Sequence, residues 1–488
     1  MQSQDLQLLL HGRASLIVVE TFDEPKAITL LQSFLKTDPA PLFQWTLTEG
    51  LCQCGLALLG DTDDTSVSLE KALLQIKQTA TPGVYVLCDV HPFMDEPKII
   101  RLIKDIVFRS APAHKLIVLG PENNLPPELS RMAVAMPVAL PNEEEILNII
   151  RTQAEQWSRL NGNVRIKTEG SALDALVAAL KGLPHGDVER LARAAIADDG
   201  AITSSDVPEV NKAKFSLMNM QGVMHFEYDT AKMSEVAGLN QFKRWLNERK
   251  SAFLTAERDI PKGVLLLGVQ GGGKSLAAKA VAGLWQVPLL RLDMASLFNK
   301  FIGETEKNLR EALALADALS PCVLWVDELE KGLAQTDSDG GLAKRILGTL
   351  LTWMAERKSR VFIVGTSNNI QQLPPELLRK GRFDEIFFVD LPERAVRQQI
   401  FRIHLQKRDV AVNTIDVTLL AEHADGFTGA EIEQAIVAGL YSACARKKPL
   451  TTEELVRALQ KTKPLSVMMA ENMAQLRAWA NERAVKAD

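Results

Sequence analysis

Short, continuously apolar runs alternate with amphipathic stretches along most of the chain, and this alternation is typical of an α/β fold. Parallel strands read as unbroken apolar runs because helices cover both of their faces. In the C-terminal half the pattern predicts strands at residues 264–267, 289–293, 322–327, 361–365 and 386–391. Helices are expected to begin near Lys274, Glu304, Lys344 and Glu393. From about Val412 onward the strands stop, which predicts a small helical subdomain.

The N-terminal half repeats this plan, with strands predicted at residues 16–20, 43–47, 84–89 and 116–120. Two pairs of segments also recur in the same order in both halves. Leu125-Pro-Pro-Glu-Leu-Ser-Arg131 matches Leu373-Pro-Pro-Glu-Leu-Leu-Arg379, and residues 182–189 resemble residues 426–433. The shared order favours a duplication over chance similarity of short helical segments. A Rossmann-like N-terminal domain of unrelated origin is the competing interpretation.

At 488 residues, of which 46% are hydrophobic and 24% charged, the chain is long enough for about two or three globular domains. A polar stretch with little periodicity separates the two halves. We therefore predict an N-terminal α/β domain at 1–200, a linker at 201–233, a second α/β core at 234–410, and a helical lid with further C-terminal helices at 411–488.

Composition argues against several classes of protein. The formal net charge is −5, and no interleaved basic and aromatic patch indicates binding to nucleic acid. The N-terminus lacks the features of a signal peptide, and no uncharged apolar stretch reaches the roughly 18 residues of a membrane span. Cys52 and Cys54 form a lone pair, which favours reduced thiols over a zinc site. A cytoplasmic location is expected, or the stroma if the chain is plastid-encoded.

The most specific motif is Gly268-Val-Gln-Gly-Gly-Gly-Lys274-Ser275, which matches the phosphate-binding pattern G-x-x-x-x-G-K-[ST] in full. It follows a predicted strand and opens a helix, as the pattern requires. Glycines let the loop curl so that backbone N–H groups face a triphosphate, and the helix N-terminus adds partial positive charge. Lys274 is expected to contact the β- and γ-phosphates of ATP, and the Ser275 hydroxyl to bind Mg²⁺.

Polar residues follow two other predicted strands. Cys322-Val-Leu-Trp-Val-Asp327-Glu328 is an apolar strand that ends in two acids, and Asn368 closes the strand near 361–365. In open α/β sheets the carboxyl ends of the strands border the ligand crevice. We expect Asp327 to hold Mg²⁺, Glu328 to activate the attacking water, and Asn368 to contact the γ-phosphate or that water. Solvated turn residues are the alternative.

These motifs resemble the AAA family of ATPases, and the resemblance extends from Ser234 to about Tyr441. It implies a P-loop NTPase fold, in which a three-layer core with a parallel sheet carries a C-terminal helical lid. It also implies that Val236-Ala-Gly-Leu239, which includes Gly238, lies against the adenine. Enzymatic hydrolysis of ATP is the expected activity.

Further residues enter through the same resemblance. In that family two arginines reach across a subunit boundary to the neighbour's γ-phosphate, and by position they are Arg379 and Arg382 here. A guanidinium supplied in this way stabilises the transition state and ties hydrolysis to assembly. The resemblance also places His404 near the nucleotide and makes Gly429-Ala430 part of the lid over the base. Arginines in local salt bridges and a structural histidine are the alternatives.

The residues expected around the nucleotide are Gly238, Gly268, Val269, Gln270, Gly271, Gly272, Gly273, Lys274, Ser275, Leu276, His404, Gly429 and Ala430. Phe301-Ile302-Gly303 resembles the aromatic pore loop with which AAA rings grip a polypeptide, although an ordinary core aromatic is the alternative. Residues 335–341 are a second pore-facing segment or merely a solvated turn. A homo-oligomer, expected to be a hexamer, that contacts a protein substrate through Phe301 follows from this resemblance.

The N-terminal half contains no G-K-[ST], and Asp89, which ends its third predicted strand, is followed by Val90 rather than a second acid. We therefore expect a degenerate ATPase-like α/β half that cannot hydrolyse ATP and serves as scaffold, adaptor or regulator. This arrangement resembles the uncharacterised bacterial and plastid AAA proteins named as a hypothetical chloroplast reading frame. Segments such as Thr352-Trp353 and Trp479-Ala480 suggest it.

No H-E-x-x-H protease motif and no guanine-binding signature occur in the sequence. The main hypothesis is therefore ATP hydrolysis that drives remodelling of a protein substrate by a ring. The alternative is a nucleotide-dependent assembly switch or scaffold that recruits partners without threading them. A nucleic-acid-associated ATPase is the less favoured third interpretation.

Overall fold

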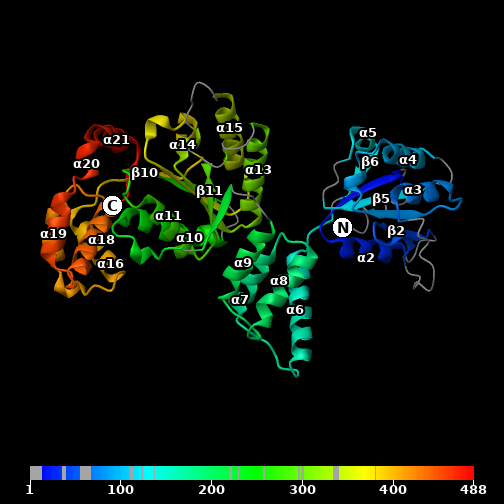
Figure 1. Ribbon diagram of the computed structural model, residues 1–488, viewed down its shortest axis with the longest axis horizontal. Helices are drawn as coiled ribbons and strands as arrows, with labels where there is room; N and C mark the ends of the chain where they lie inside the picture. Colours follow the sequence, from blue (N-terminus) through cyan, green and yellow to red (C-terminus); the bar gives the residue numbers. More distant parts are fainter. Residues whose placement is uncertain are drawn as a thin grey trace. The chain divides into compact units, whose positions relative to one another are not determined.

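The chain divides into two compact units, Met1–Val210 and Asn211–Asp488, which Figure 1 traces in sequence colours. The structure is a computed structural model that describes residues 12, 14–35, 40–54, 67–109, 114–121, 125–136, 138–218, 223–228, 230–255, 259–294, 297, 302–333, 340–379 and 381–488. For residues 34, 35, 302–304, 333 and 340 it describes the backbone alone. Each unit is built on its own largely parallel sheet.

The sheet of the second unit has the strand order β15-β14-β10-β13-β12-β11-β9. Its strands are β9 (Met224–Glu227), β10 (Gly263–Gly268), β11 (Leu289–Asp293), β12 (Cys322–Asp327), β13 (Val361–Ser367), β14 (Glu385–Val389) and β15 (Val485–Lys486). All neighbours are parallel except β9 and β11. The predicted strands are confirmed to within two residues at either end. The carboxyl ends of β10, β12 and β13 therefore meet at one edge.

Helices cover both faces of this sheet, so that alternate strand residues enter different hydrophobic cores. On β10, Val264 packs into one core and Leu265 into the other. The first core is closed by α10 (Asn240–Thr255) and α11 (Lys274–Trp285), and the second by α13 (Ile302–Ala318) and α15 (Gly340–Glu356). The central strands are therefore apolar along their length, because neither face of the sheet meets water at its centre. The predicted three-layer core is confirmed.

A helical bundle with its own core follows the sheet. It consists of α16 (Arg394–Gln406), α17 (Val417–His423), α18 (Gly429–Ala445) and α19 (Thr452–Lys461). Phe401, Leu420, Ile432 and Leu455 are fully buried between these helices. This bundle, which we call the lid, is the predicted helical part of an AAA fold.

The chain then returns to the sheet, contrary to the prediction that strands stop after Val412. Beyond α20 (Leu465–Met468) and α21 (Ala470–Arg483), β15 pairs with β14. Ala487 is 1% exposed, and its carbonyl accepts hydrogen bonds from the backbone N–H groups of Gln241 and Phe242. A strand of two residues is too short to show any periodicity, and the strand with which it pairs lies far away in sequence.

Residues 201–233, expected to be a linker, instead contain ordered elements. They are β8 (Ala201–Ile202), α9 (Asp206–Leu217), β9 and the 3-10 turn η2 (Met233–Glu235). In α9, Lys214 is 1% exposed, and its ammonium donates to Ala318 O at 2.8 Å. Burial lowers the pKa of Lys214 to about 8. The segment is polar in composition, yet tertiary contacts hold its described elements α9 and β9.

The first unit has the strand order β3-β2-β4-β5-β1-β6. Its strands are β1 (Leu16–Glu20), β2 (Leu42–Thr46), β3 (Gly50–Gln53), β4 (Val84–Cys88), β5 (Lys115–Gly120) and β6 (Ala133–Ala135). Its helices include α2 (Glu24–Leu35), α3 (Leu69–Gln78) and α4 (Pro97–Val107), followed by α6 (Glu143–Leu160), α7 (Gly170–Leu180) and α8 (His185–Ala197). When the parallel strands are numbered along each unit and the short edge strand β15 is set aside, both sheets run fifth, first, fourth, third, second. This shared order supports the duplication.

Candidate nucleotide-binding site

The glycine-rich loop joins β10 to α11, and its glycines occupy positions that a side chain would disturb. Gly271 and Gly273 have φ of 76° and 93°, a left-handed conformation that favours glycine. A Cβ on Gly268 would lie 2.1 Å from Val389 O, so the neighbouring strand leaves no room for one. The loop therefore curls tightly before the N-terminus of α11 and leaves that helix end open to an anion.

Lys274 is the first residue of α11, and its ammonium lies inside the curled loop. Nζ donates to Gly268 O at 2.9 Å, to Val269 O at 2.7 Å and to Asn368 Oδ1 at 2.6 Å. The residue is 6% exposed. Burial lowers its pKa to about 8, while nearby carboxylates, chiefly that of Glu330, oppose the shift. The loop thus holds a buried cation beside the N–H groups of a helix start.

The two acids at the end of β12 are fixed by a threonine of β13. Thr366 Oγ1 donates to Asp327 Oδ1 at 2.6 Å and accepts from the backbone N–H of Glu328 at 3.0 Å. Glu328 has φ of 48°, so the chain turns sharply there and directs the two carboxylates differently. Asn368 Nδ2 donates to Glu328 Oε1 at 3.3 Å, and Lys331 Nζ lies 2.5 Å from Oε2.

Sequence reasoning did not identify Thr366 or Glu330. Glu330 is 4% exposed, and its Oε1 accepts from the backbone N–H of Asn368 at 2.9 Å. Its acidic side chain near the end of a buried strand, in Asp327-Glu-Leu-Glu330, was an available signal. Thr366 lies one residue beyond the strand end predicted at 365, and its role depends on a neighbouring strand that the sequence alone does not reveal.

The glycine-rich loop and the ends of β12 and β13 border one cavity of about 400 Å³. On its phosphate side are residues 270–276, Asp327, Glu328, Thr366 and Asn368. Its opposite side is formed by the core residues Glu235, Val236, Ala237 and Leu239 and by the lid residues Ile400, Ile403, His404, Gly429, Ala430 and Glu433. The lid touches the loop directly, since Ala430 N donates to Gly271 O at 3.2 Å. One side is thus polar and the other largely apolar, as a nucleotide requires.

Several predicted residues lie around the cavity rather than in its wall. Gly268 ends β10 behind the loop, and Val269 lines a neighbouring groove. Gly238 has φ of 62°, and its N–H donates to Gln399 of the lid at 3.3 Å. Gly238 therefore shapes the segment that carries Val236 and Leu239.

The two predicted arginines do not line the cavity. Arg379 follows the 3-10 turn η4 (Pro375–Leu378) and is exposed, whereas Arg382 is partly buried and donates to Glu376 O. Neither is among the residues that border the candidate phosphate site of its own chain. Phe301 and most of the loop 335–341 lie outside the described residues.

The oxygen donors at the phosphate side suit a magnesium ion. Ser275 and Asp327 both line the cavity, and hydroxyl and carboxylate oxygens are ligands that Mg²⁺ prefers. Among the described residues no cluster of three or more His, Cys, Asp or Glu side chains forms a cage for a metal. This donor set fits an ion that takes the rest of its ligands from water and phosphate.

The corresponding place in the first unit holds acids instead. Helix α2 begins at Glu24, and the Asp23 carboxylate accepts from Lys26 N at 3.2 Å. After β4, Asp89 has φ of 52° and so takes the backbone position of Glu328, while Cys88 precedes it where β12 has Asp327. A phosphate would meet negative charge here, which fits a degenerate ATPase-like half.

Comparisons with known proteins agree with this geometry. Residues 264–391 match the model of the ATPase family associated with various cellular activities (AAA). Residues 2–138 match the N-terminal domain of SpoVK-like AAA ATPases, and residues 144–221 match the second domain of that group. No helix within the described part of the chain has the length and apolar character to cross a membrane.

Similar proteins match nearly the whole chain or a part of it. An uncharacterized AAA domain-containing protein, ycf46, of Guillardia theta is 32% identical over 98% of this chain and 94% of its own length. A proteasome-activating nucleotidase of Aeropyrum pernix is 35% identical over 42% of this chain and 52% of its own length. A cell division cycle protein 48 homolog of Archaeoglobus fulgidus is 29% identical over 65% of this chain and 45% of its own length. The chain is thus a member of the AAA family of ATPases, enzymes that hydrolyse ATP.

Proposed function

We propose that this ATPase binds ATP with Mg²⁺ in the cavity around Lys274 and uses its hydrolysis to remodel a protein substrate as a ring oligomer, expected to be a hexamer. The main support is the polar network at the sheet edge, where one amide, that of Asn368, contacts both Lys274 and Glu328. A relative that is named for activating a proteasome supports a protein as the substrate.

The proposed chemistry assigns each group a separate task. Lys274 and the loop N–H groups bind the β- and γ-phosphates, while Ser275 and Asp327 hold the metal. The bound ion neutralises phosphate charge and orients the leaving group. Glu328 accepts a proton from the attacking water, and Asn368 orients that water or the γ-phosphate. The hydrogen bonds of Thr366 hold Asp327 and Glu328 in position for these tasks.

Arg379 and Arg382 are proposed to act on the site of a neighbouring subunit. What supports this is their position, since they follow η4 and do not border the cavity of their own chain. A guanidinium supplied by a neighbour makes hydrolysis depend on assembly. Contact between Ala430 and Gly271 offers a route by which nucleotide state moves the lid.

The function is tested first with Glu328→Gln. The amide cannot accept the proton of water, so ATP hydrolysis is expected to fall by about 10²-fold or more. Binding of ATP is expected to persist, because the loop and Lys274 are intact. Phosphate release and equilibrium titration with ATP measure the two quantities. Hydrolysis at the parental rate would show that Glu328 is not the base, and a parental protein that does not bind ATP would refute the site itself.

Thr366→Val tests how the acids are held. The variant keeps the shape of the side chain but loses both hydrogen bonds to the Asp327–Glu328 turn, so hydrolysis is expected to fall roughly tenfold or more. Thr366→Ser keeps the hydroxyl and is the matched control, expected to stay near the parental rate. Equal rates for the two variants would remove Thr366 from the proposed arrangement.

Mixing two inactive variants tests completion of the site by a neighbour. Arg382→Ala lacks the arginine but has an intact phosphate loop, whereas Lys274→Ala lacks the loop cation but supplies Arg382. If subunits mix at random in a ring, half of the sites retain Lys274 and half of those receive Arg382, so roughly a quarter of parental activity is expected. Activity no greater than the sum of the separate variants would argue against arginines in trans.

Phe301→Ala separates a motor from an assembly switch. A threading motor is expected to lose substrate processing, because the aromatic grip is gone, while it keeps its basal ATPase rate. A switch that recruits partners through the first unit is expected to be indifferent. The measurement compares basal ATP hydrolysis with unfolding of a substrate captured by the Glu328→Gln variant. Unchanged unfolding would favour the switch.

A further inference from the structure

The end of the cavity remote from the phosphate loop has a polar corner that the mechanism above does not use. It is formed by His404 on α16 and Glu433 on α18, both of which line the cavity. Each lies four residues beyond a lid residue near the loop. His404 follows Ile400 by four and Glu433 follows Gly429 by four, so each side chain is one helical turn further along the same face.

That helical turn is counted from the place where the lid contacts the loop. A Cβ placed on Gly429 would lie 3.6 Å from Gly271 O and 3.8 Å from Ile400 Cδ1. One turn of α-helix advances about 5.4 Å. His404 and Glu433 therefore lie about one helical turn beyond the contact between the lid and the loop.

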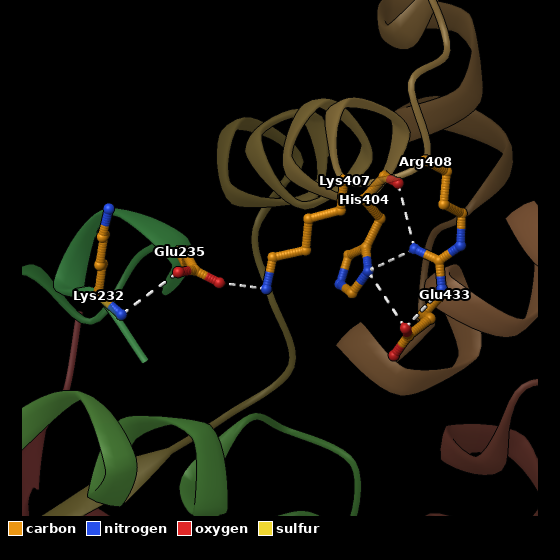
Figure 2. A network of polar contacts seen from close by, with 6 residues as sticks. All are labelled: Lys232, Glu235, His404, Lys407, Arg408 and Glu433. Carbon is orange, nitrogen blue, oxygen red and sulfur yellow. Dashed lines mark hydrogen bonds and ion pairs between the residues drawn. The ribbon is translucent and has the colours of Figure 1, made fainter. Parts of the chain in front are cut away.

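Arg408 holds both side chains of this corner, as Figure 2 shows. Its Nη2 donates to Glu433 Oε1 at 2.7 Å, and its Nη1 donates to His404 O at 3.1 Å and faces His404 Nδ1 at 3.3 Å. A guanidinium has no acceptor atom, so Nδ1 accepts and the ring proton resides on Nε2. Burial lowers the pKa of His404, which favours this neutral form.

Glu433 is ionised and only half engaged. Partial burial raises its pKa. The hydrogen bond from Arg408 and the neighbouring positive charges together lower the pKa by more, so the net shift is downward. Arg408 donates to Oε1, which also lies 3.4 Å from His404 Nδ1, an atom that carries no proton in this tautomer. Among the residues drawn in Figure 2, none is joined by a dashed line to Oε2 or to His404 Nε2. A donor and an acceptor thus stand side by side at the cavity.

A second pair of charges ties the facing wall of the cavity to the lid. Lys407, which directly follows α16, contacts the carboxylate of Glu235, which belongs to the core segment that carries Val236 and Leu239 (Figure 2). Val236, Leu239 and Ile403 offer an apolar surface that suits a base. The carboxylate of Glu433 does not suit a phosphate, because like charges repel. Between phosphate and base lies the sugar, whose vicinal hydroxyls both donate and accept hydrogen bonds.

We propose that Glu433, held by Arg408, accepts a hydrogen bond from a ribose hydroxyl of the bound nucleotide and makes this ATPase select ribonucleotides over deoxyribonucleotides. His404 Nε2–H donates to the same diol. Carboxylates that bind a ribose hydroxyl are a general device of nucleotide sites. The inference rests on the nucleotide site proposed above and adds a specificity-determining residue to it.

The test is calorimetric titration of the full chain with ATP, 2′-deoxy-ATP and 3′-deoxy-ATP in the presence of Mg²⁺. The parental protein is expected to bind at least one deoxy analogue about tenfold more weakly than ATP, because a hydrogen bond to a charged group is lost. Glu433→Ala is expected to bind ATP as weakly as the parental protein binds that analogue, and to bind the analogue with unchanged affinity.

Glu422→Ala is the matched control. Glu422 is an exposed glutamate of the lid that pairs with Arg394 and does not line the cavity. It is expected to keep the parental preference for ATP. Equal affinity of the parental protein for ATP and both deoxy analogues would overturn the inference, as would a preference that survives in Glu433→Ala. A Glu433-dependent difference between ATP and GTP, without one between ATP and the deoxy analogues, would assign the residue to the base and also overturn it. No binding of ATP at all would instead refute the proposed function.

Discussion

A buried ammonium at the edge of an apolar sheet is the constraint on which the rest of the candidate site depends. Taking the charge of Lys274 out of water costs free energy unless hydrogen-bond acceptors replace the solvent. Two loop carbonyls and the Asn368 amide supply them. The loop can present those carbonyls only if it curls as the glycines allow, and Asn368 can reach Nζ only if Glu330 holds its backbone.

The first unit shows what the same architecture becomes without that cation. Its lid-like helix α8 also contacts the first βα junction by its N-terminal turn, since Gly186 N donates to Asp23 Oδ2 at 3.0 Å. Gly186 corresponds to Ala430 in the repeated segments, and Ala430 N donates to a loop carbonyl instead. A side-chain carboxylate therefore joins the helical part to the sheet where the second unit has a phosphate-binding loop. Negative charge at the start of α2 satisfies the helix end and excludes a phosphate.

The sequence predicts what is local and misses what is set by distant partners. Central strands and the Lys274 loop were identified because unbroken apolar runs and a contiguous motif need no tertiary information. The strands β9 and β15 were missed because they are short and lie at the sheet edges, where packing against remote segments decides the conformation. Thr366 was missed because its hydroxyl matters only through the register of β12 and β13. Glu433 was missed because its role depends on Arg408, which lies in the turn after α16.

The order of strands offers a physical link between the phosphate binding and the water activation that we propose. Because β13 lies between β10 and β12, residues at its end face both neighbours. Thr366 holds the acids that follow β12, and two residues later Asn368 reaches the lysine that follows β10. One amide accepts from Lys274 and donates to Glu328. A phosphate that draws Lys274 toward itself would therefore alter the hydrogen bonding of Asn368 and, through it, the freedom of Glu328 to turn toward water.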